Sequence, residues 1–369
     1  MPLYLNDEQA MLRDTAAEFV TEHAPVRHLR ALRDADDQTG FSRDLWRQFA
    51  EMGFTGILVP EDQGGLGLGH VEAGVVMEAI GRNLSPSPFL STAVAAVEAL
   101  KGTAHAARWF RGIAGGETVA ALAIDEGAKH TGRVVMAAER SGNGFKLSGT
   151  KRSVQHGHVA DLILVAAQTG EGVTLFAVEA GAAGLTADPR RLADSSLASE
   201  LVFDGVEVDA DAVIGEVGGG QAVLDRLLAA GRTGASAELL GVGGGAMDMT
   251  VDYLKQRKQF GQPIGSFQAL QHRAAHLYSE MEIARAAVLK AQQLLDAGDP
   301  RAGEATMVAK AMTGLATTLS VQEGIQMHGG IGMTDDYDIG FYMKRARVLA
   351  ELFGDAGHHA DALARASGY

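Results

Sequence analysis

The sequence predicts an α+β protein that is mainly α: an N-terminal helical domain, a small antiparallel β domain and a C-terminal four-helix bundle. Three observations predict it. Apolar residues follow a helical period to about residue 115, a period of two from about 118 to 215, and a helical period again from about 219. We therefore expect domains at residues 1–117, 118–216 (β-barrel-like) and 217–369. The chain has 369 residues, 46% of them hydrophobic, which is enough for a large core divided among two or three units.

The N-terminal segment begins with a clear helix start. In "LNDEQAMLRDTAAEFVTEHA", Asn6 stands where an N-cap is expected, ahead of apolar residues at helical spacing. "SRDLWRQFAEMGF" and "VEAGVVMEAIGRNL" are further predicted helices. The "GGLGLG" between them has the glycine spacing of a dinucleotide fingerprint, but no strand–helix crossover surrounds it. We predict a connecting loop there.

The middle segment is predicted to contain short strands. "VVMAAERSGNGFKLSG" predicts two strands around an Asn143-Gly144 turn, a strong hairpin signal. "DLILVAAQ", "VTLFAVEA" and "SELVFDGVEV" are further runs rich in branched residues. Because no helical pattern intervenes, we expect an antiparallel arrangement.

The last segment contains the most regular helix. Its apolar residues alternate steps of four and three and form one stripe suited to bundle packing: Leu270, Ala274, Leu277, Met281, Ala284, Val288, Ala291 and Leu295. "LDAGDP" ends this helix with a glycine and a proline. Another helix is expected over roughly 303–328, broken by "HGGIGMTDD".

Composition excludes several classes of protein. The chain carries 32 basic and 46 acidic residues, a net charge of −14, which repels nucleic-acid backbones. There is no cysteine, so disulfides, thiolate catalysis and cysteine-based metal sites are excluded, and we expect no metal. No run reaches the ~18–20 apolar residues of a membrane helix. No secretory signal is visible. We expect a cytoplasmic protein with no membrane span.

Three motifs in this order resemble the acyl-CoA dehydrogenase family over essentially the whole chain. They are "MGFTGILVPEDQGGLGLG", "RKQFGQPIGSFQALQHRAA" (257–275) and "IQMHGGIGMT" (325–334). The resemblance implies FAD as cofactor, and oxidation of an acyl-CoA thioester to its trans-2-enoyl form. It also implies an electron-transfer flavoprotein as electron acceptor, and subunits that complete each other's flavin sites.

The resemblance assigns the residues that reach the FAD of a neighbouring subunit, here called the trans contacts. An arginine offers a forked donor for a pyrophosphate, an aromatic ring can contact the nucleotide, and glycines let the backbone approach closely. The residues that match are Arg257, Lys258, Gln259, Phe260, Phe267, Gln268, Gln326, Met327, His328, Gly329 and Gly330. Taken alone, each stretch could equally be a cationic helix end or a glycine cap.

The contacts to the chain's own flavin, the cis contacts, match the family less well. Where the family has a Thr-Glu-Pro…Gly-Ser-Asp segment, this chain has "AIDEGAKHTG" (123–132). After the Gly-x-Lys turn, Ser153 stands at the place of the family's shielding aromatic residue, and Gln155 at that of its threonine. Gln155 could still donate a hydrogen bond to the flavin, or be an ordinary strand residue.

The catalytic base expected in the family is missing from both of its known positions. Removing a weakly acidic α-proton next to a thioester requires a positioned carboxylate. An ungapped alignment on "QMHGG" puts the usual glutamate at Phe353. A second branch of the family has it on an earlier helix, which falls on Gly231, followed by Arg232. Arg232 could orient the substrate, brace this region or form a structural ion pair.

The neighbours of Phe353 offer weaker candidates for a base. Glu351 and Asp355 each lie two residues away, about 200° around a helix, so neither would point the same way. Asp355 remains a candidate if the segment is a turn. Glu351 is expected to pair with Arg345 or Arg347. His358 and His359 could be bases, or belong to a helix start near the surface. We therefore assign no catalytic residue.

Three interpretations remain open. The first is a degenerate subunit that completes the flavin site of a catalytic paralogue, as in heteromeric bacterial members that degrade steroid side chains, with a heterotetramer as the expected assembly. The second is a self-sufficient homo-oligomeric enzyme with an atypical base. The third is a flavin-free acyl-CoA-binding or scaffold protein, disfavoured because "RKQFG" and "QMHGG" are retained. The acyl specificity is not readable from the sequence.

Overall fold

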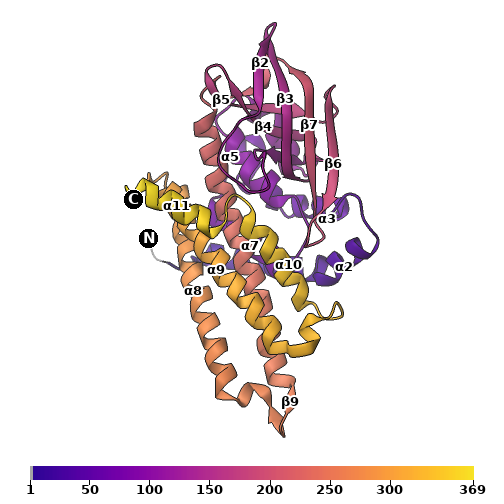
Figure 1. Ribbon diagram of the computed structural model, residues 1–369, viewed down its shortest axis with the longest axis vertical. Coiled ribbons are helices and arrows are strands. Elements are labelled where there is room, and N and C mark those ends of the chain that lie inside the picture. The colour runs from indigo at the N-terminus through magenta and orange to yellow at the C-terminus, as the bar shows by residue number, and fades with distance from the viewer. Residues whose placement is uncertain (1–2) are drawn as a thin grey trace. The chain divides into compact units, whose positions relative to one another are not determined.

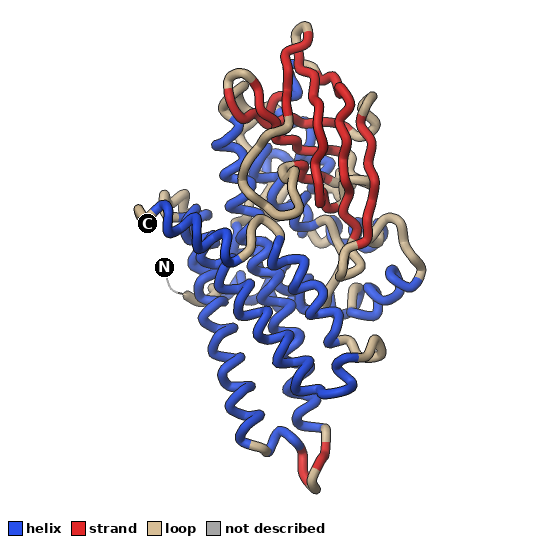
Figure 2. The backbone as a smooth tube through the Cα atoms, viewed as in Figure 1, coloured by secondary structure: helices blue, strands red, loops and turns tan. Residues whose placement is uncertain are grey.

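The computed structural model of the chain describes residues 3–369 (Figures 1 and 2). The predicted fold class is confirmed: N-terminal helices are followed by a β sheet and then by a helical bundle. Contacts between Cα atoms divide the chain into two compact units, Met1–Ala31 with His70–Ser85 and Arg232–Tyr369, and Leu32–Gly69 with Pro86–Gly231. The three domain boundaries expected from the sequence stay a prediction.

The first unit is entirely helical apart from a small hairpin. Its two N-terminal helices, α1 and α4, belong with the bundle although they precede the sheet in the chain. Helices α2 and α7 each run across the division between the units. The helices are α1 (Asp7–His23), α2 (Val26–Asp34), α4 (His70–Arg82), α7 (Gly220–Gln256), α8 (Gln268–Asp296), α9 (Ala302–His328), α10 (Ile339–Glu351) and α11 (Ala356–Ala366).

Local signals set the ends of these helices as expected. Asn6 caps α1: its side chain accepts from Gln9 N–H, and the Gln9 side chain accepts from Asn6 N–H, which completes a capping box. The predicted apolar stripe of α8 is buried from Leu277 to Ala291. Beyond its C-cap the chain turns at Gly298, whose φ of +61° favours glycine. Helix α9 ends at His328, followed by the short helix η6 (Gly329–Met333).

The second unit holds the β sheet together with short helices. The helices are α3 (Arg43–Glu51), η1 (Phe54–Gly56), η2 (Glu61–Gln63), the π-helical η3 (Leu90–Ala96), α5 (Val97–Leu100), α6 (His105–Ala114) and η4 (Ala210–Ala212). The strands are β1 (Ala120–Ala123), β2 (Ala137–Ser141), β3 (Gly144–Gln155), β4 (Leu162–Thr169), β5 (Gly172–Glu179), β6 (Leu185–Arg191), β7 (Leu197–Val208) and β8 (Val213–Ile214).

The sheet has the order β6-β7-β3-β2-β4-β5-β8, and Figure 1 shows β2, β3, β7 and β6 side by side. Most neighbours are antiparallel, as predicted. However, β1 pairs with β4 in parallel. Strands β2 and β4 are also parallel to each other, and a single residue pair, Ala137–Gln168, joins them. The sheet is therefore mixed. Inward residues of the period-two runs, such as Phe145, Phe176 and Phe203, form its core.

Two local expectations have different outcomes. The predicted hairpin between β2 and β3 forms, but Ser141 pairs with Gly144, so the turn residues are Gly142 and Asn143. Gly142 takes a φ of +56°, which explains why the turn shifts by one residue. The "GGLGLG" stretch is a loop, as predicted. Among the residues described, no helix is long and apolar enough to cross a bilayer.

Candidate functional site

The end of α7 and the start of α8 are joined by the predicted trans segment. It forms a hairpin of β9 (Lys258–Gln259) and β10 (Gln262–Pro263), followed by η5 (Ile264–Ser266). Arg257 N–H donates to Tyr253 O at 2.8 Å, and Ile264 N–H donates to Arg257 O at 2.8 Å, so the hairpin is closed by local bonds. The backbone around Arg257 is thereby fixed without help from the β sheet.

The tip of this hairpin presents an uncovered aromatic ring. Phe260 has a φ of +54° and is followed by Gly261 at +80°, a tight turn that places the ring outside. The Phe260 side chain is 91% exposed. Its nearest aromatic neighbour is Phe267, edge-on with ring centroids 6.2 Å apart. Phe267 precedes Gln268, the exposed first residue of α8.

The second trans segment lies at the C-terminal end of α9. Gln326 is exposed, and a methyl group added at Gly329 or Gly330 would meet no atom within 4 Å. Met327 and His328 instead turn their side chains inward. Met327 packs with Leu254 and Leu277. The side chains of these two residues are therefore not available to a ligand.

The His328 ring is held from several sides. Its Nδ1 lies 2.7 Å from Gly324 O, and the ring lies 4.5 Å from that of Tyr253 and 4.8 Å from that of Tyr337, between centroids. Burial lowers the pKa of His328, against the opposing hydrogen bond to Gly324 O. The imidazole is therefore a neutral part of the bundle end at physiological pH.

The cis segment of the β sheet is organised around a buried ion pair. Lys151 is fully buried, and its Nζ lies 2.6 Å from Glu126 Oε1. The Glu126 carboxylate also accepts from the N–H groups of Val135 and Met136. Burial alone would raise the pKa of Glu126, but the hydrogen bonds from Lys151 and Met136 outweigh it and hold this pKa below its usual value.

The remaining cis residues lie beside this ion pair in the sequence. His130 Nδ1 lies 2.7 Å from Asp125 Oδ1, and Arg152 N–H donates to Asp125 O. Register shifts by one residue between Lys151 and Val154, which makes a β-bulge containing the exposed Ser153 at a φ of +55°. Gln155 ends β3 and is half-buried. The bulge therefore presents a serine where the family has an aromatic residue.

Phe353, the residue that the ungapped alignment assigns to the usual base, lies just beyond α10. Phe353 is 3% exposed and has a φ of +58°, a left-handed conformation that is uncommon for an aromatic residue. Arg232, on α7, has its Nε 3.4 Å from Phe353 O. Gly231, the alternative base position, lies one residue earlier on the same helix, where no side chain exists to act.

Sequence reasoning missed a buried lysine beneath this turn. Lys310 of α9 is 1% exposed, and its Nζ donates to Ala350 O at 3.0 Å and to Gly354 O at 3.1 Å. Burial, together with the positive charge of Arg232, lowers the pKa of Lys310 to about 7. The lone lysine in the apolar run "MVAKAM" was the available signal. The Lys310 side chain thereby links Ala350, before Phe353, to Gly354, after it.

The acidic neighbours of Phe353 have structural tasks. Glu351 pairs with Arg347 at 3.0 Å, as expected. Arg345, the other expected partner of Glu351, has its Nε 2.7 Å from Glu238 Oε1 instead. The Asp355 side chain accepts from His358 N–H and caps α11, so the segment is a helix start, one of the two alternatives predicted, but with His359 buried rather than near the surface.

His358 and His359 pack against the Phe353 turn. A methyl group at Gly354 would lie 2.6 Å from His358 Cδ2 and 2.9 Å from His359 Cε1, so both imidazoles approach this glycine closely. The His359 side chain is completely buried. Among the described residues, no group of three or more histidine or acidic side chains could hold a metal ion.

The trans residues fit a flavin adenine dinucleotide, and the cis residues fit it less well. An exposed arginine, an uncovered aromatic ring and open glycine backbone are the groups that a pyrophosphate and an adenine require. In the cis segment, by contrast, the Lys151 ammonium and two N–H groups already hold the Glu126 carboxylate. Together with the order of helices, sheet and bundle, the trans residues agree with the flavin-dependent dehydrogenase class that the sequence motifs resemble.

Comparisons with known proteins make this class specific. The N-terminal, middle and C-terminal domains of acyl-CoA dehydrogenases match residues 6–117, 123–206 and 218–368. The "Acyl-CoA dehydrogenase IpdE2" of Mycobacterium tuberculosis is 34% identical over 352 residues, covering 94% of this chain and 93% of that protein. The chain belongs to the acyl-CoA dehydrogenase family, whose members are FAD-dependent oxidoreductases.

Two solved structures are similar over nearly the whole chain. A variant of the "Tcur3481-Tcur3483 steroid ACAD" superposes with a TM-score of 0.90 at 32% identity, covering 98% of this chain and 99% of that one. The "ChsE4-ChsE5 complex from Mycobacterium tuberculosis" superposes with a TM-score of 0.91 at 27% identity, covering 99% and 98%. Both names describe assemblies of two different chains.

Proposed function

We propose that this chain is the non-catalytic partner in a heteromeric acyl-CoA dehydrogenase, in which a paralogue supplies the base and the cis flavin contacts. The observation that carries the proposal is Phe353. A buried phenyl ring, which can neither accept nor release a proton, stands at the position to which the ungapped alignment assigns the family's glutamate. The reaction of the assembly is α,β-dehydrogenation of an acyl-CoA thioester.

The surroundings of Phe353 support this interpretation. A base must be free to accept the α-proton within hydrogen-bond reach. Glu351 is engaged by Arg347, and the Asp355 carboxylate accepts from the first turn of α11. Either side chain would have to give up these bonds to act as a base. Arg232, bonded to Phe353 O, then braces the turn rather than orienting a substrate.

The trans residues are the contribution of this chain to catalysis. Arg257 provides a forked donor for a pyrophosphate, Phe260 a ring for the nucleotide, and Gly329 and Gly330 open backbone. When bound, FAD accepts the hydride that leaves the β-carbon of the thioester. The chain's own residues position the cofactor for the paralogue and move no proton.

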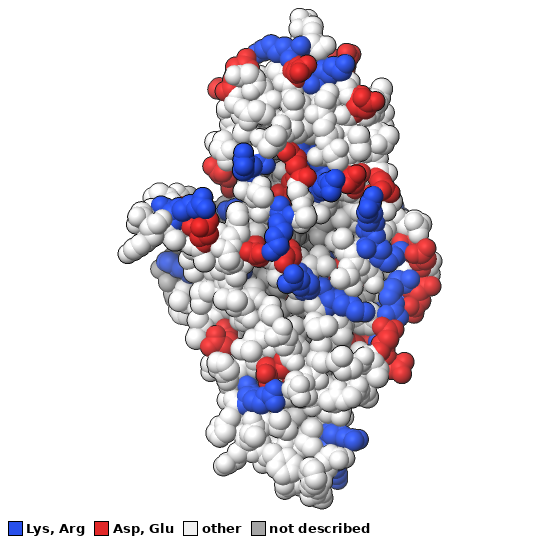
Figure 3. Space-filling model, in the orientation of Figure 1, with Lys and Arg blue, Asp and Glu red and all other residues white. Residues whose placement is uncertain are grey.

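The surface of the bundle supports a partner subunit. On the face drawn in Figure 3, the end of the bundle that carries β9 has few charged side chains. Helices α8 and α9 also expose large apolar side chains, which mark interaction surfaces when they gather: Tyr278, Ile283, Val308 and Leu315. The name of one similar structure, the "Tcur3481-Tcur3483 steroid ACAD", suggests a steroid-derived acyl-CoA as substrate. We further expect an electron-transfer flavoprotein as acceptor.

A visible absorption spectrum and a native mass, measured on the same sample, test the proposal. The chain expressed alone should be colourless, with flavin bound only after co-expression with a catalytic paralogue, in a complex of both chains. A yellow homo-oligomer with about one flavin per subunit, active on an acyl-CoA, would instead support the self-sufficient enzyme. Loss of flavin from the co-expressed complex after Arg257→Ala, but not after the matched Arg365→Ala on the exposed part of α11, would locate the trans contact.

A further inference from the structure

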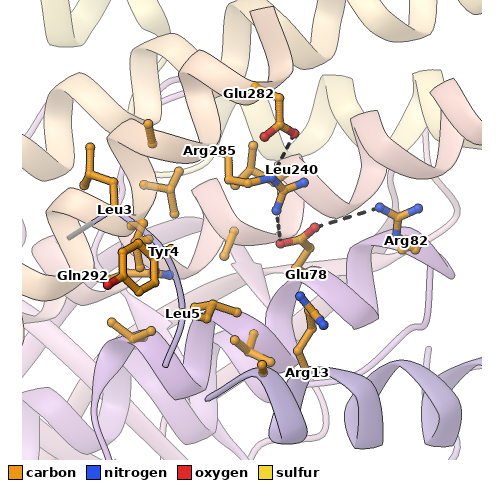
Figure 4. A pocket seen from close by; sticks show the side chains of 18 residues that line it. Leu3, Tyr4, Leu5, Arg13, Glu78, Arg82, Leu240, Glu282, Arg285 and Gln292 are labelled. Atoms are coloured by element: carbon orange, nitrogen blue, oxygen red, sulfur yellow. Dashed lines mark hydrogen bonds and ion pairs between the residues drawn. The ribbon is translucent and has the colours of Figure 1, made fainter. Parts of the chain in front are cut away.

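A cavity of about 650 Å³ lies within the helical unit, apart from the trans residues and from Phe353. Side chains from α1, α4, α7 and α8 line it, and residues 3–5 form one wall (Figure 4). Pockets for drug-sized ligands measure about 300–1,000 Å³, so this one can hold a small molecule. All of its lining belongs to one compact unit.

Most of the cavity wall is apolar. Leu5 comes from the N-terminal segment, Val71 and Val75 from α4, Leu240 from α7 and Leu289 from α8. A wall of this kind favours an apolar body, because burying apolar surface yields about 25 cal/mol per Å².

The charged side chains gather at one end of the cavity, and each has a partner of opposite charge; Arg13 pairs with Asp14 at 2.8 Å. Figure 4 shows Arg285 between Glu78 and Glu282. Arg285 Nη1 lies 2.6 Å from Glu78 Oε2, and its Nε lies 3.2 Å from Glu282 Oε1. Arg82 pairs with Asp248 and lies 4.0 Å from Glu78. Since these charges are already compensated, an additional charged ligand would have to break a pair. A neutral ligand would not.

A polar side chain is left for a ligand. Gln292 is 5% exposed and lines the cavity, and within residues 3–369 no hydrogen bond to its amide is found. Gly74 faces it: a methyl group there would collide with Gln292 Nε2, so the glycine leaves the room that the amide occupies. A polar group on a ligand can bond to this amide, and one such hydrogen bond contributes about 0.5–1.5 kcal/mol.

We propose that this cavity binds a neutral lipid-like molecule, with an apolar alkyl or polycyclic body and one carbonyl or hydroxyl group that hydrogen-bonds to Gln292. The charged side chains and the segment Leu3–Leu5 both line the cavity (Figure 4). This site is distinct from the residues proposed for the flavin, and the inference does not depend on the role of Phe353.

The test uses two fluorescent probes on the full chain, in whichever assembly it forms. Nile red is neutral and carries a carbonyl group, whereas pyrene is a hydrocarbon without a hydrogen-bonding group. Both should bind saturably, with one blue-shifted Nile red per chain. Displacement of Nile red by decan-1-ol would identify an alkyl ligand, and displacement by progesterone a polycyclic one. Absence of saturable binding, or displacement by neither compound, overturns the proposal.

Matched variants test whether the two probes bind inside this cavity. Ala286→Trp fills the cavity from α8 and should weaken both probes at least tenfold, whereas Ser279→Trp, on the same helix but exposed, should leave both unchanged. Val75→Phe fills the cavity from α4 and serves if the first variant does not fold. If neither filling variant weakens binding, the probes bind elsewhere and the proposal is wrong.

The amide is tested by Gln292→Leu, which keeps the size of the side chain. One lost hydrogen bond of about 1 kcal/mol corresponds to roughly fivefold weaker binding of Nile red. Pyrene should bind the variant at least as well as it binds the wild type. Equal weakening of both probes would show that Gln292 only shapes the cavity, and would overturn the assigned hydrogen bond.

Discussion

Lys310→Met is the perturbation that tests the Phe353 turn most directly. The variant removes an ammonium group that donates to Ala350 O and Gly354 O on either side of Phe353. Methionine has a similar length and is apolar, so it fills the same space among the helices. The substitution therefore removes the positive charge of Lys310, which is unfavourable when buried.

The pKa of Lys310 sets the sign and the size of the effect. Its folded-state pKa of about 7 lies well below the ordinary 10.5. Between these values the unfolded chain holds a proton that the folded chain releases, so the free energy of unfolding rises with pH by up to about 1.4 kcal/mol per unit. From pH 7.0 to 8.5 the wild type should therefore gain about 1.5–2 kcal/mol relative to the variant.

Urea denaturation followed by circular dichroism measures this difference. Midpoints and slopes are compared at pH 7.0, 7.75 and 8.5, and other titrating groups cancel because both proteins contain them. Lys255→Met is the control, since Lys255 is exposed on α7 and pairs only across one helix turn with Asp252. Parallel pH profiles for the wild type and Lys310→Met would refute the reasoning, because Lys310 would then be protonated in the folded chain throughout.

Three further outcomes are expected. Phe260→Ala in the co-expressed complex should lower flavin retention at least tenfold. The free energy of unfolding should change by less than about 0.5 kcal/mol, because the ring is exposed. Flavin absorbance after gel filtration measures the retention, and unchanged retention would contradict the assigned contact. Phe353→Ala should cost about 3–5 kcal/mol in urea. Phe353→Gly should cost no more, because glycine relieves the left-handed backbone by about 1 kcal/mol; a clearly worse glycine variant would contradict this. Arg345→Met should cost about 3–5 kcal/mol by removing the ion-pair partner that Arg345 provides to the buried Glu238, and adding Glu238→Gln should recover part of it; thermal denaturation shows whether it does.

Much of the fold follows from local patterns in the sequence. Asn6 and the apolar stripe of α8 each depend on residues within a few turns, so periodicity and capping suffice to predict them. The parallel pairing of β1 with β4 joins Ala120 to Leu162, across a hairpin, and no local signal specifies it. The β2–β3 turn was displaced by one residue because both Gly142 and Gly144 can serve in a hairpin, and only Gly142 takes a positive φ.

The candidate site was predictable where a contiguous motif carries it. "RKQFG" led to the exposed hairpin because its residues are neighbours in the chain. The environment of Phe353 was not predictable, since Arg232, Lys310 and Gly354 come from three separate segments. Their meeting depends on how α7, α9 and α10 pack, which a single sequence does not specify. A lysine within an apolar helical run indicates a buried cation but not its partner.

The hairpin of β9 and β10 depends only on hydrogen bonds among its own residues and the adjoining turns of α7. Substitutions in the β sheet, including those that build the Glu126–Lys151 pair, therefore leave it undisturbed. After a gene duplication, one copy can accumulate changes in its own cofactor pocket while still serving the other copy. Two paralogues can then divide catalysis and cofactor contacts between them without any new structure, because one copy only has to lose its own cofactor pocket.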